Sequence, residues 1–150
     1  MLKISVQVNG IPETIASLQR VKQVLSTFEP ELTSIGEYLM TFFSENVFAS
    51  EGQIYGERWF DLSMEYEMWK VKHYPGRGIL QASGTLQGGY RAMTTENYLL
   101  IGNQTDYAIF HQLGTSKMPQ RILLQIDQER QNAIIDMLRE GVIERIKNVL

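Results

Sequence analysis

The stretch that decides the fold runs from Asp106 to Ile126 and reads DYAIFHQLGTSKMPQRILLQI. Asp106 is a residue type that caps helix N-termini, and Gly114 suits the left-handed residue that ends a helix. Pro119 then prevents further helix and pushes Met118 before it toward extended backbone. The stretch therefore predicts a short capped helix, a glycine stop, a Pro-Gln-Arg corner and an apolar strand-like run that ends at Ile126.

Upstream of this stretch, the hydrophobic pattern predicts a strand followed by three helices. Residues 2–8 alternate apolar and polar side chains, as a half-buried strand does. Apolar residues then recur at helical spacing over 11–28 and again over 30–43, and these two helices could pack as a hairpin or form one kinked rod. A third helix is expected over 59–69, where Trp and other apolar residues fall on one face.

The fold class follows from the order of these elements. The segments 90–95 and 98–103 flank Glu96-Asn97 and predict an antiparallel hairpin, while Asp127 caps a final helix with an apolar stripe. The expected order is β-α-α-loop-α-β-β-α-β-α, with strands connected locally. This order favours an α+β fold in which a small, mainly antiparallel sheet is packed by amphipathic helices.

Length and composition limit the class of protein. A chain of 150 residues with 43% apolar and 21% charged residues is expected to fold as one domain over 1–150. Without cysteine it can form neither disulfides nor thiolate metal sites. The net charge of −3 offers no global attraction to DNA or to an anionic membrane. No apolar run approaches the ~20 residues of a membrane span and no signal peptide is evident, so we expect a soluble, unprocessed protein.

The chain carries no recognisable catalytic motif. His73 and His111 lie far apart and lack the spacing of a zinc site, and the glycines between 76 and 89 match no phosphate-binding loop. Ser83 lies in no nucleophile elbow. We therefore interpret His111 as a structural histidine bonded to backbone and Arg121 as a structural or interfacial residue, and we expect no catalytic residue, cofactor or metal.

Four motifs follow one another over roughly residues 50–126. They are Trp59 with Leu62-Ser63; Leu80 with Ser83-Gly84 and Leu86; Tyr107-Ala108 with His111-Gln112 and Gly114-Thr115; and Pro119 and Arg121 with Leu123-Leu124. In this order they resemble the motifs of phage virion morphogenesis proteins, the tail-completion family of tailed phages, although Ile122 and Leu123 depart from the Pro and Phe that the family commonly has there.

The resemblance implies a structural virion protein without chemistry of its own. Such proteins complete and cap the head-proximal end of the tail tube as a ring, usually a hexamer, and join it to the neck. Its implied partners are further copies of the chain, the tail tube protein, a neck or connector protein, and DNA that passes through the lumen without specific binding. A head–tail connector or stopper is the alternative, and an unrelated small ligand-binding module or enzyme is the second alternative.

A set of aromatic, glycine, proline and basic residues is expected to form the interfaces or the structural corner. Aromatic side chains give large contact area at interfaces, although each can equally lie in the core. We expect Arg121 to bond a carboxylate or carbonyls. The glycine-rich ends of the segment 51–78 are expected to be mobile in the isolated subunit, and one or both should become ordered against a neighbouring subunit, the tail tube or the neck. The candidate residues are Tyr55, Trp59, Tyr74, Tyr107, His111, Gly114, Pro119 and Arg121.

Overall fold

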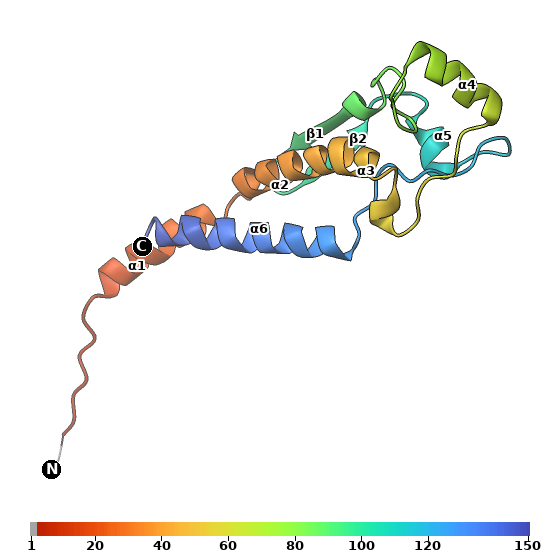
Figure 1. The fold of residues 1–150 in the computed structure, drawn as a ribbon. Helices are drawn as coiled ribbons and strands as arrows, with labels where there is room; N and C mark the ends of the chain where they lie inside the picture. Colours follow the sequence, from red (N-terminus) through yellow and green to blue (C-terminus); the bar gives the residue numbers. More distant parts are fainter. Residues whose placement is uncertain (1–2) are drawn as a thin grey trace.

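The computed structural model describes residues 3–150, which form an elongated α+β molecule with a long N-terminal arm (Figure 1). Helices build most of it, and one β-hairpin forms its sheet. Its elements are α1 (Ile11–Val24), α2 (Glu29–Thr41), η1 (Phe42–Asn46), α3 (Val47–Ala49), η2 (Gln53–Tyr55), α4 (Met64–His73), η3 (Gln87–Gly89), β1 (Tyr90–Thr94), β2 (Leu99–Asn103), α5 (Ala108–Leu113) and α6 (Gln128–Lys147).

A continuous helical rod from Glu29 to Ala49 forms the centre of the molecule. It comprises α2, a π-helical turn and α3, and it starts with Pro30 in its first turn, where the absent N–H costs no helical hydrogen bond. Its buried apolar residues recur every three to five positions, singly or as adjacent pairs, and so share one side of the rod. That side is buried and consists of Ile35, Leu39, Phe42, Phe43, Val47 and Phe48.

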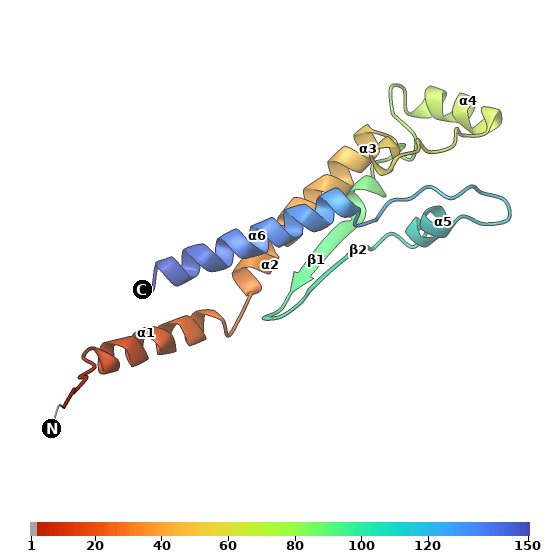
Figure 2. The ribbon, with the colours of Figure 1, turned by 90° about the horizontal axis from the view of Figure 1, so that it is seen from below.

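The rod lies between α6 and the hairpin (Figure 2). On the α6 side, the buried carboxylate of Glu31 accepts a hydrogen bond from Arg145 Nη1 at 2.7 Å. Gly141 lets the two helices approach, because a Cβ there would lie 2.6 Å from Glu31 Cγ. On the other side, β1 pairs antiparallel with β2 in the register that joins residue 90 to 103 and residue 94 to 99.

Aromatic side chains make the core where the rod meets the hairpin. Tyr90 stacks on Phe43 with ring centroids 5.7 Å apart, and Phe48 meets Trp59 edge to face at 5.4 Å. All four residues are buried. Such pairs add about 0.5–1.5 kcal/mol each beyond their buried area, so this cluster fixes the position of the segment that carries Trp59.

The connecting segments and short helices gather at one end of the rod, which we call the head (residues 50–89 and 104–126) (Figure 1). Here α4 begins at Met64, after Ser63 accepts a hydrogen bond from the backbone of Tyr66 as N-cap. The helix predicted over 59–69 therefore begins later, at Met64, and ends later, at His73, and Trp59 lies on the segment before it. Burial of Trp59 against the core keeps this segment out of the helix.

The first predicted strand is wrong. Residues 3–10 form no strand and their side chains are exposed, because no second strand lies beside them; residue 2 lies outside the described residues. Nor do α1 and α2 form a hairpin or one rod. Instead α1 lies along the C-terminal end of α6, where Arg20 Nε donates to Val149 O at 2.8 Å. We call residues 3–24 the arm.

The 90–95/98–103 hairpin, the final helix and its cap at Asp127 are confirmed. Asp106, however, is not the cap of the short helix, because α5 begins at Ala108 after Tyr107 and shows no side-chain cap. The apolar run after Pro119 is also not a strand. Among residues 3–150 the sheet therefore contains β1 and β2 alone.

Candidate functional site

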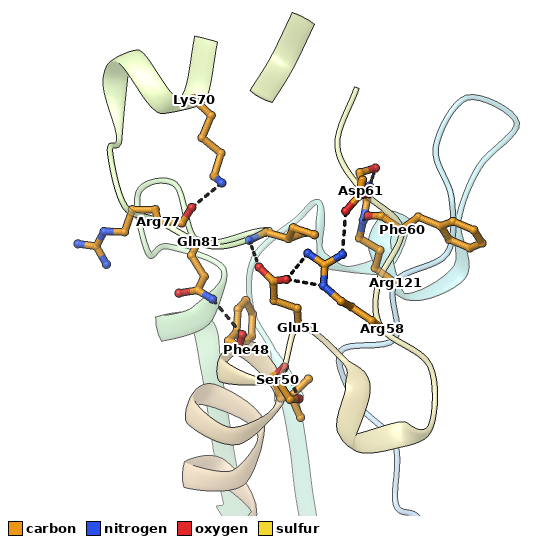
Figure 3. A network of polar contacts seen from close by, with 12 residues as sticks. Phe48, Ser50, Glu51, Arg58, Phe60, Asp61, Lys70, Arg77, Gln81 and Arg121 are labelled. Atoms are coloured by element: carbon orange, nitrogen blue, oxygen red, sulfur yellow. Dashed lines mark hydrogen bonds and ion pairs between the residues drawn. The ribbon is translucent and has the colours of Figure 1, made fainter. Parts of the chain in front are cut away.

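The Pro-Gln-Arg corner is attached to the head through Arg121, whose side chain is 4% exposed. Its guanidinium donates from Nε to Phe60 O and from Nη2 to Asp61 O, both at 3.0 Å, and its backbone N–H donates to His111 O at 2.8 Å. Figure 3 shows Arg121 reaching the backbone before α4. Burial lowers the pKa of Arg121, and the nearby Asp61 carboxylate opposes this effect. Arg121 thus connects the corner, α5 and the segment before α4.

Gln112 supplies the hydrogen bonds that a neighbouring strand would give to the segment after the corner. Its Oε1 accepts from the N–H groups of Leu123 and Leu124 at 2.8 and 3.0 Å, and its Nε2 donates to Leu124 O at 2.9 Å. Trp59 and Tyr90 continue this pattern by donating to Ile122 O and Leu123 O at 3.0 and 3.1 Å. Side chains therefore satisfy this backbone, which explains why the predicted strand is absent.

The turn between α5 and the corner depends on Gly114. Its backbone φ of +71° is one that residues with a Cβ rarely adopt, and a positive φ was predicted for the residue that ends the helix. A Cβ at this position would also lie only 2.8 Å from Gln120 N. Thr115 and Met118 then pair through backbone hydrogen bonds of 2.8 and 3.3 Å. Pro119 follows on the exposed side of this turn.

His111 lies half-buried beside Arg121, with its ring edge-on to Tyr107 at 6.1 Å. The expected backbone hydrogen bond is not formed at Nδ1, which is buried without a partner among the described residues. Burial lowers the pKa of His111, and the positive charge of Arg121 lowers it further. The neutral imidazole is therefore the favoured form.

The remaining aromatic candidates divide between core and surface. Trp59 is 4% exposed and belongs to the core. Tyr55 is half-buried against Phe42, with its hydroxyl accepting from Gln125 N at 3.3 Å, and burial raises its pKa. Tyr74 is half-buried against the partly exposed Trp69, with ring centroids 5.9 Å apart. A groove of about 590 Å³ between α4 and the corner brings Tyr74, Tyr107, His111, Pro119 and Arg121 together.

Glu51 fixes both ends of the glycine-rich segment (Figure 3). One carboxylate oxygen accepts from Ile79 N at 2.9 Å and the other from Arg58 Nε at 2.8 Å. The buried Lys70 donates to Arg77 O at 2.6 Å. Both ends of the segment 51–78 thus form hydrogen bonds within their own subunit, and their ordering by a neighbour stays a prediction. Sequence reasoning missed Gln112, Glu51 and Lys70 as structural residues, although the His-Gln pair was a visible signal for the first.

Exposed apolar side chains concentrate at the two ends of the molecule. At the head they project from the segment before α4, from α4 and from α5, namely Phe60, Met64, Met68, Val71, Ile109, Phe110 and Leu113, which together we call the head surface. At the opposite end they line the arm, namely Ile4, Val6, Val8, Ile11, Ile15 and Leu18. Exposed apolar side chains gathered in one region are typical of interaction sites.

Two further observations concern membrane and metal sites. Among residues 3–150, no helix combines the length and the apolar character that a bilayer crossing requires. In the same part of the chain, no group of three or more His, Asp or Glu side chains is arranged to hold a metal ion.

Comparison with known proteins identifies the class. The model of the phage virion morphogenesis family matches residues 7–142, which is most of the chain. The "Mu-like prophage FluMu G protein 1" of Haemophilus influenzae is similar, with 33% identity over 103 residues that cover 67% of this chain and 70% of that protein. No solved structure matches. The chain belongs to the phage virion morphogenesis family, as its motifs indicated, and has a structural role in building the virion.

Proposed function

We propose that this protein completes and caps the head-proximal end of the phage tail tube as a hexameric ring and joins the tube to the neck. Its partners in this proposal are further copies of itself, the tail tube protein and a neck or connector protein. The ring is structural, and we assign it no catalytic residue, cofactor or metal. The net charge of −3 suits a lumen through which DNA passes without specific binding.

One observation supports the ring most directly: an arm with exposed apolar side chains projects from the rest of the molecule (Figures 1 and 2). A cyclic ring uses heterologous contacts, so each subunit needs two different and complementary surfaces. In this proposal the exposed apolar residues of the arm supply one such surface, and the body of the next copy supplies the other. The head surface remains for contact with the tube or the neck.

The rigidity of the head also fits a structural junction. Arg121, Gln112 and Glu51 hold the segments around α4 and α5 by hydrogen bonds to backbone groups. Groups held in this way present a fixed surface, which reduces the entropy lost when a partner binds. The corner residues thus act by positioning the head surface, not by chemistry.

Inactivating the gene in the phage that carries it tests this function, with a plasmid copy as control. We expect electron micrographs to show filled heads beside separate tails whose head-proximal ends are open or extended to irregular lengths. The plasmid copy should restore complete particles. Tails of normal length with closed ends, beside heads that lose their DNA, would contradict the capping function and favour a head–tail connector.

A further inference from the structure

We propose that residues 3–8 of one copy add as a third β-strand to the free edge of β2 in a second copy. This inference rests on the self-association in the proposed function and names the contact that carries it. Residues 4, 6 and 8 are Ile, Val and Val, with side chains 86%, 85% and 68% exposed. Their polar neighbours Lys3, Ser5 and Gln7 occupy the alternate positions. This alternation matches a half-buried strand, yet the segment has no sheet to join in its own subunit.

The hairpin offers a matching edge. Thr95 N donates to Tyr98 O and Gln104 N donates to Gly89 O, both at 2.9 Å, and these bonds set the phase of the ladder. Because hydrogen-bonded and non-bonded pairs alternate in an antiparallel ladder, the backbone groups of residues 99, 101 and 103 point away from β1. These N–H and C=O groups have no hydrogen-bond partner among residues 3–150.

The edge of β2 is more open than the edge of β1. On β1, Tyr90 O already accepts a hydrogen bond from Arg91 Nη1 at 2.6 Å, and the Thr94 hydroxyl lies 3.4 Å from that of Thr33 on α2. A two-stranded sheet is also only marginally stable, and an open edge is a template for a strand from another chain. Addition of a peptide to such an edge is an established mode of recognition.

The arm cannot reach this edge in its own subunit. Phe28 N donates to Glu96 O at 2.7 Å, so the hairpin turn lies at the base of α1. The 14 residues of α1 then carry residue 11 about 21 Å from that base, at 1.5 Å per residue. Arg145 fixes the C-terminal end of α1, at this base, by donating to Val24 O at 2.6 Å. The arm points away from the body in both views, so the strand it joins belongs to a second copy (Figures 1 and 2).

Cysteine cross-linking tests this contact, because the chain has no cysteine of its own. One tagged variant carries Ser5→Cys or Val6→Cys, and a differently tagged variant carries Leu100→Cys. Since each chain then has one thiol, a disulfide between the two tags joins two copies. Residues 5 and 6 face opposite sides of a strand, so one of the two mixtures should form the mixed disulfide and the other much less. Glu140→Cys on the exposed face of α6 replaces Leu100→Cys as the control and should form little.

A pair of charge variants tests the face of the strand. Val6→Asp/Val8→Asp and Ser5→Asp/Gln7→Asp each add two negative charges to a segment without contacts in its own subunit, so both should fold as the wild type does. Burying carboxylates is unfavourable, so the first variant should weaken self-association at least about tenfold and the second should change it much less. Light scattering in solution and cross-linking in purified particles measure the self-association of both variants.

The outcomes separate this inference from the proposed function. Assembly that neither charge variant weakens, without a mixed disulfide at Leu100, would contradict strand addition and leave the ring intact. Protein that stays monomeric both in solution and in particles would contradict the ring and strand addition together. A mixed disulfide of Ser5→Cys that Val6→Asp/Val8→Asp abolishes, or one of Val6→Cys that Val8→Asp abolishes, would establish the contact.

Discussion

The side chain of Gln112 pairs with the backbone of Leu124 as a neighbouring β-strand would, donating from Nε2 to Leu124 O and accepting at Oε1 from Leu124 N. The same Oε1 also accepts from Leu123 N at 2.8 Å. One amide therefore satisfies three backbone groups. This relationship explains how the corner holds an extended segment against the core without a sheet.

Replacing Gln112 should reveal the contribution of this pairing to stability. In Gln112→Ala three backbone groups lose their partner, and we expect the free energy of unfolding to fall by about 2–4 kcal/mol, at about 1–3 kcal/mol for each group that stays unpaired. Urea unfolding followed by circular dichroism measures this. Gln125→Ala, at an exposed position nearby, is the control and should change it by less than about 0.5 kcal/mol. Equal effects of the two variants would show that the amide pairing is not stabilising.

The second prediction concerns Arg121. In Arg121→Ala the carbonyls of Phe60 and Asp61 lose their donor, so we expect a loss of about 1–3 kcal/mol and fewer complete particles. Arg121→Lys should recover part of the loss, because an ammonium cannot reproduce the planar geometry of two guanidinium donors. Arg139→Ala removes an exposed ion pair with Asp136 and should cost at most about 0.5 kcal/mol in the same denaturant assay. An Arg121→Ala protein as stable as wild type would refute the structural role.

The third prediction tests the contact between the rod and α6. Glu31 is buried beside Arg145, so Glu31→Gln should weaken the charge-assisted hydrogen bond and lower the free energy of unfolding by about 2–3 kcal/mol. Glu37→Gln, at an exposed position of the same helix, is the matched control and should stay within about 0.5 kcal/mol of wild type. Chemical denaturation of both variants at pH 7 measures these free energies of unfolding. A decrease in Glu31→Gln no larger than that of the control would contradict a stabilising contact between Glu31 and Arg145.

The fourth prediction concerns the pH dependence of stability. Burial lowers the pKa of His111, with a further contribution from Arg121, whereas an unfolded histidine titrates near pH 6.5. As the pH falls below about 6.5, the unfolded state binds a proton that the folded state does not yet bind, so this contribution to stability is lost toward lower pH. We expect the free energy of unfolding to fall less between pH 7.5 and 5.5 in His111→Gln than in wild type. Parallel pH profiles would contradict this.

The sequence predicted those elements whose signals are local. The hairpin at Glu96-Asn97 and the helix capped by Asp127 depend on residues within a few positions of each other, and both are confirmed. The α+β class followed from them. The family motifs also pointed to the correct class of protein, because several were spread in order over the head.

The failures arose where distant residues decide the local structure. The run after Pro119 looked like a strand because it is apolar and follows a proline that prevents helix. The side chains of Gln112, Trp59 and Tyr90 provide its backbone partners in place of a neighbouring strand. Trp59 looked helical by spacing, yet its burial against Phe48 holds it on the segment before α4. Periodicity alone predicted a strand at residues 4–8. The segment forms no strand because it has no partner strand within its own subunit.

The position of this chain in a map of the assembled phage particle tests the central claim most directly. The capping function predicts a ring of six copies that closes the last layer of the tail tube, with the head surface against the tube or the neck. An electron cryomicroscopy map of the junction between head and tail, at a resolution that traces α6 and the arm, would show it. Density for the chain elsewhere in the particle, or its absence from complete particles, would contradict the function proposed for it.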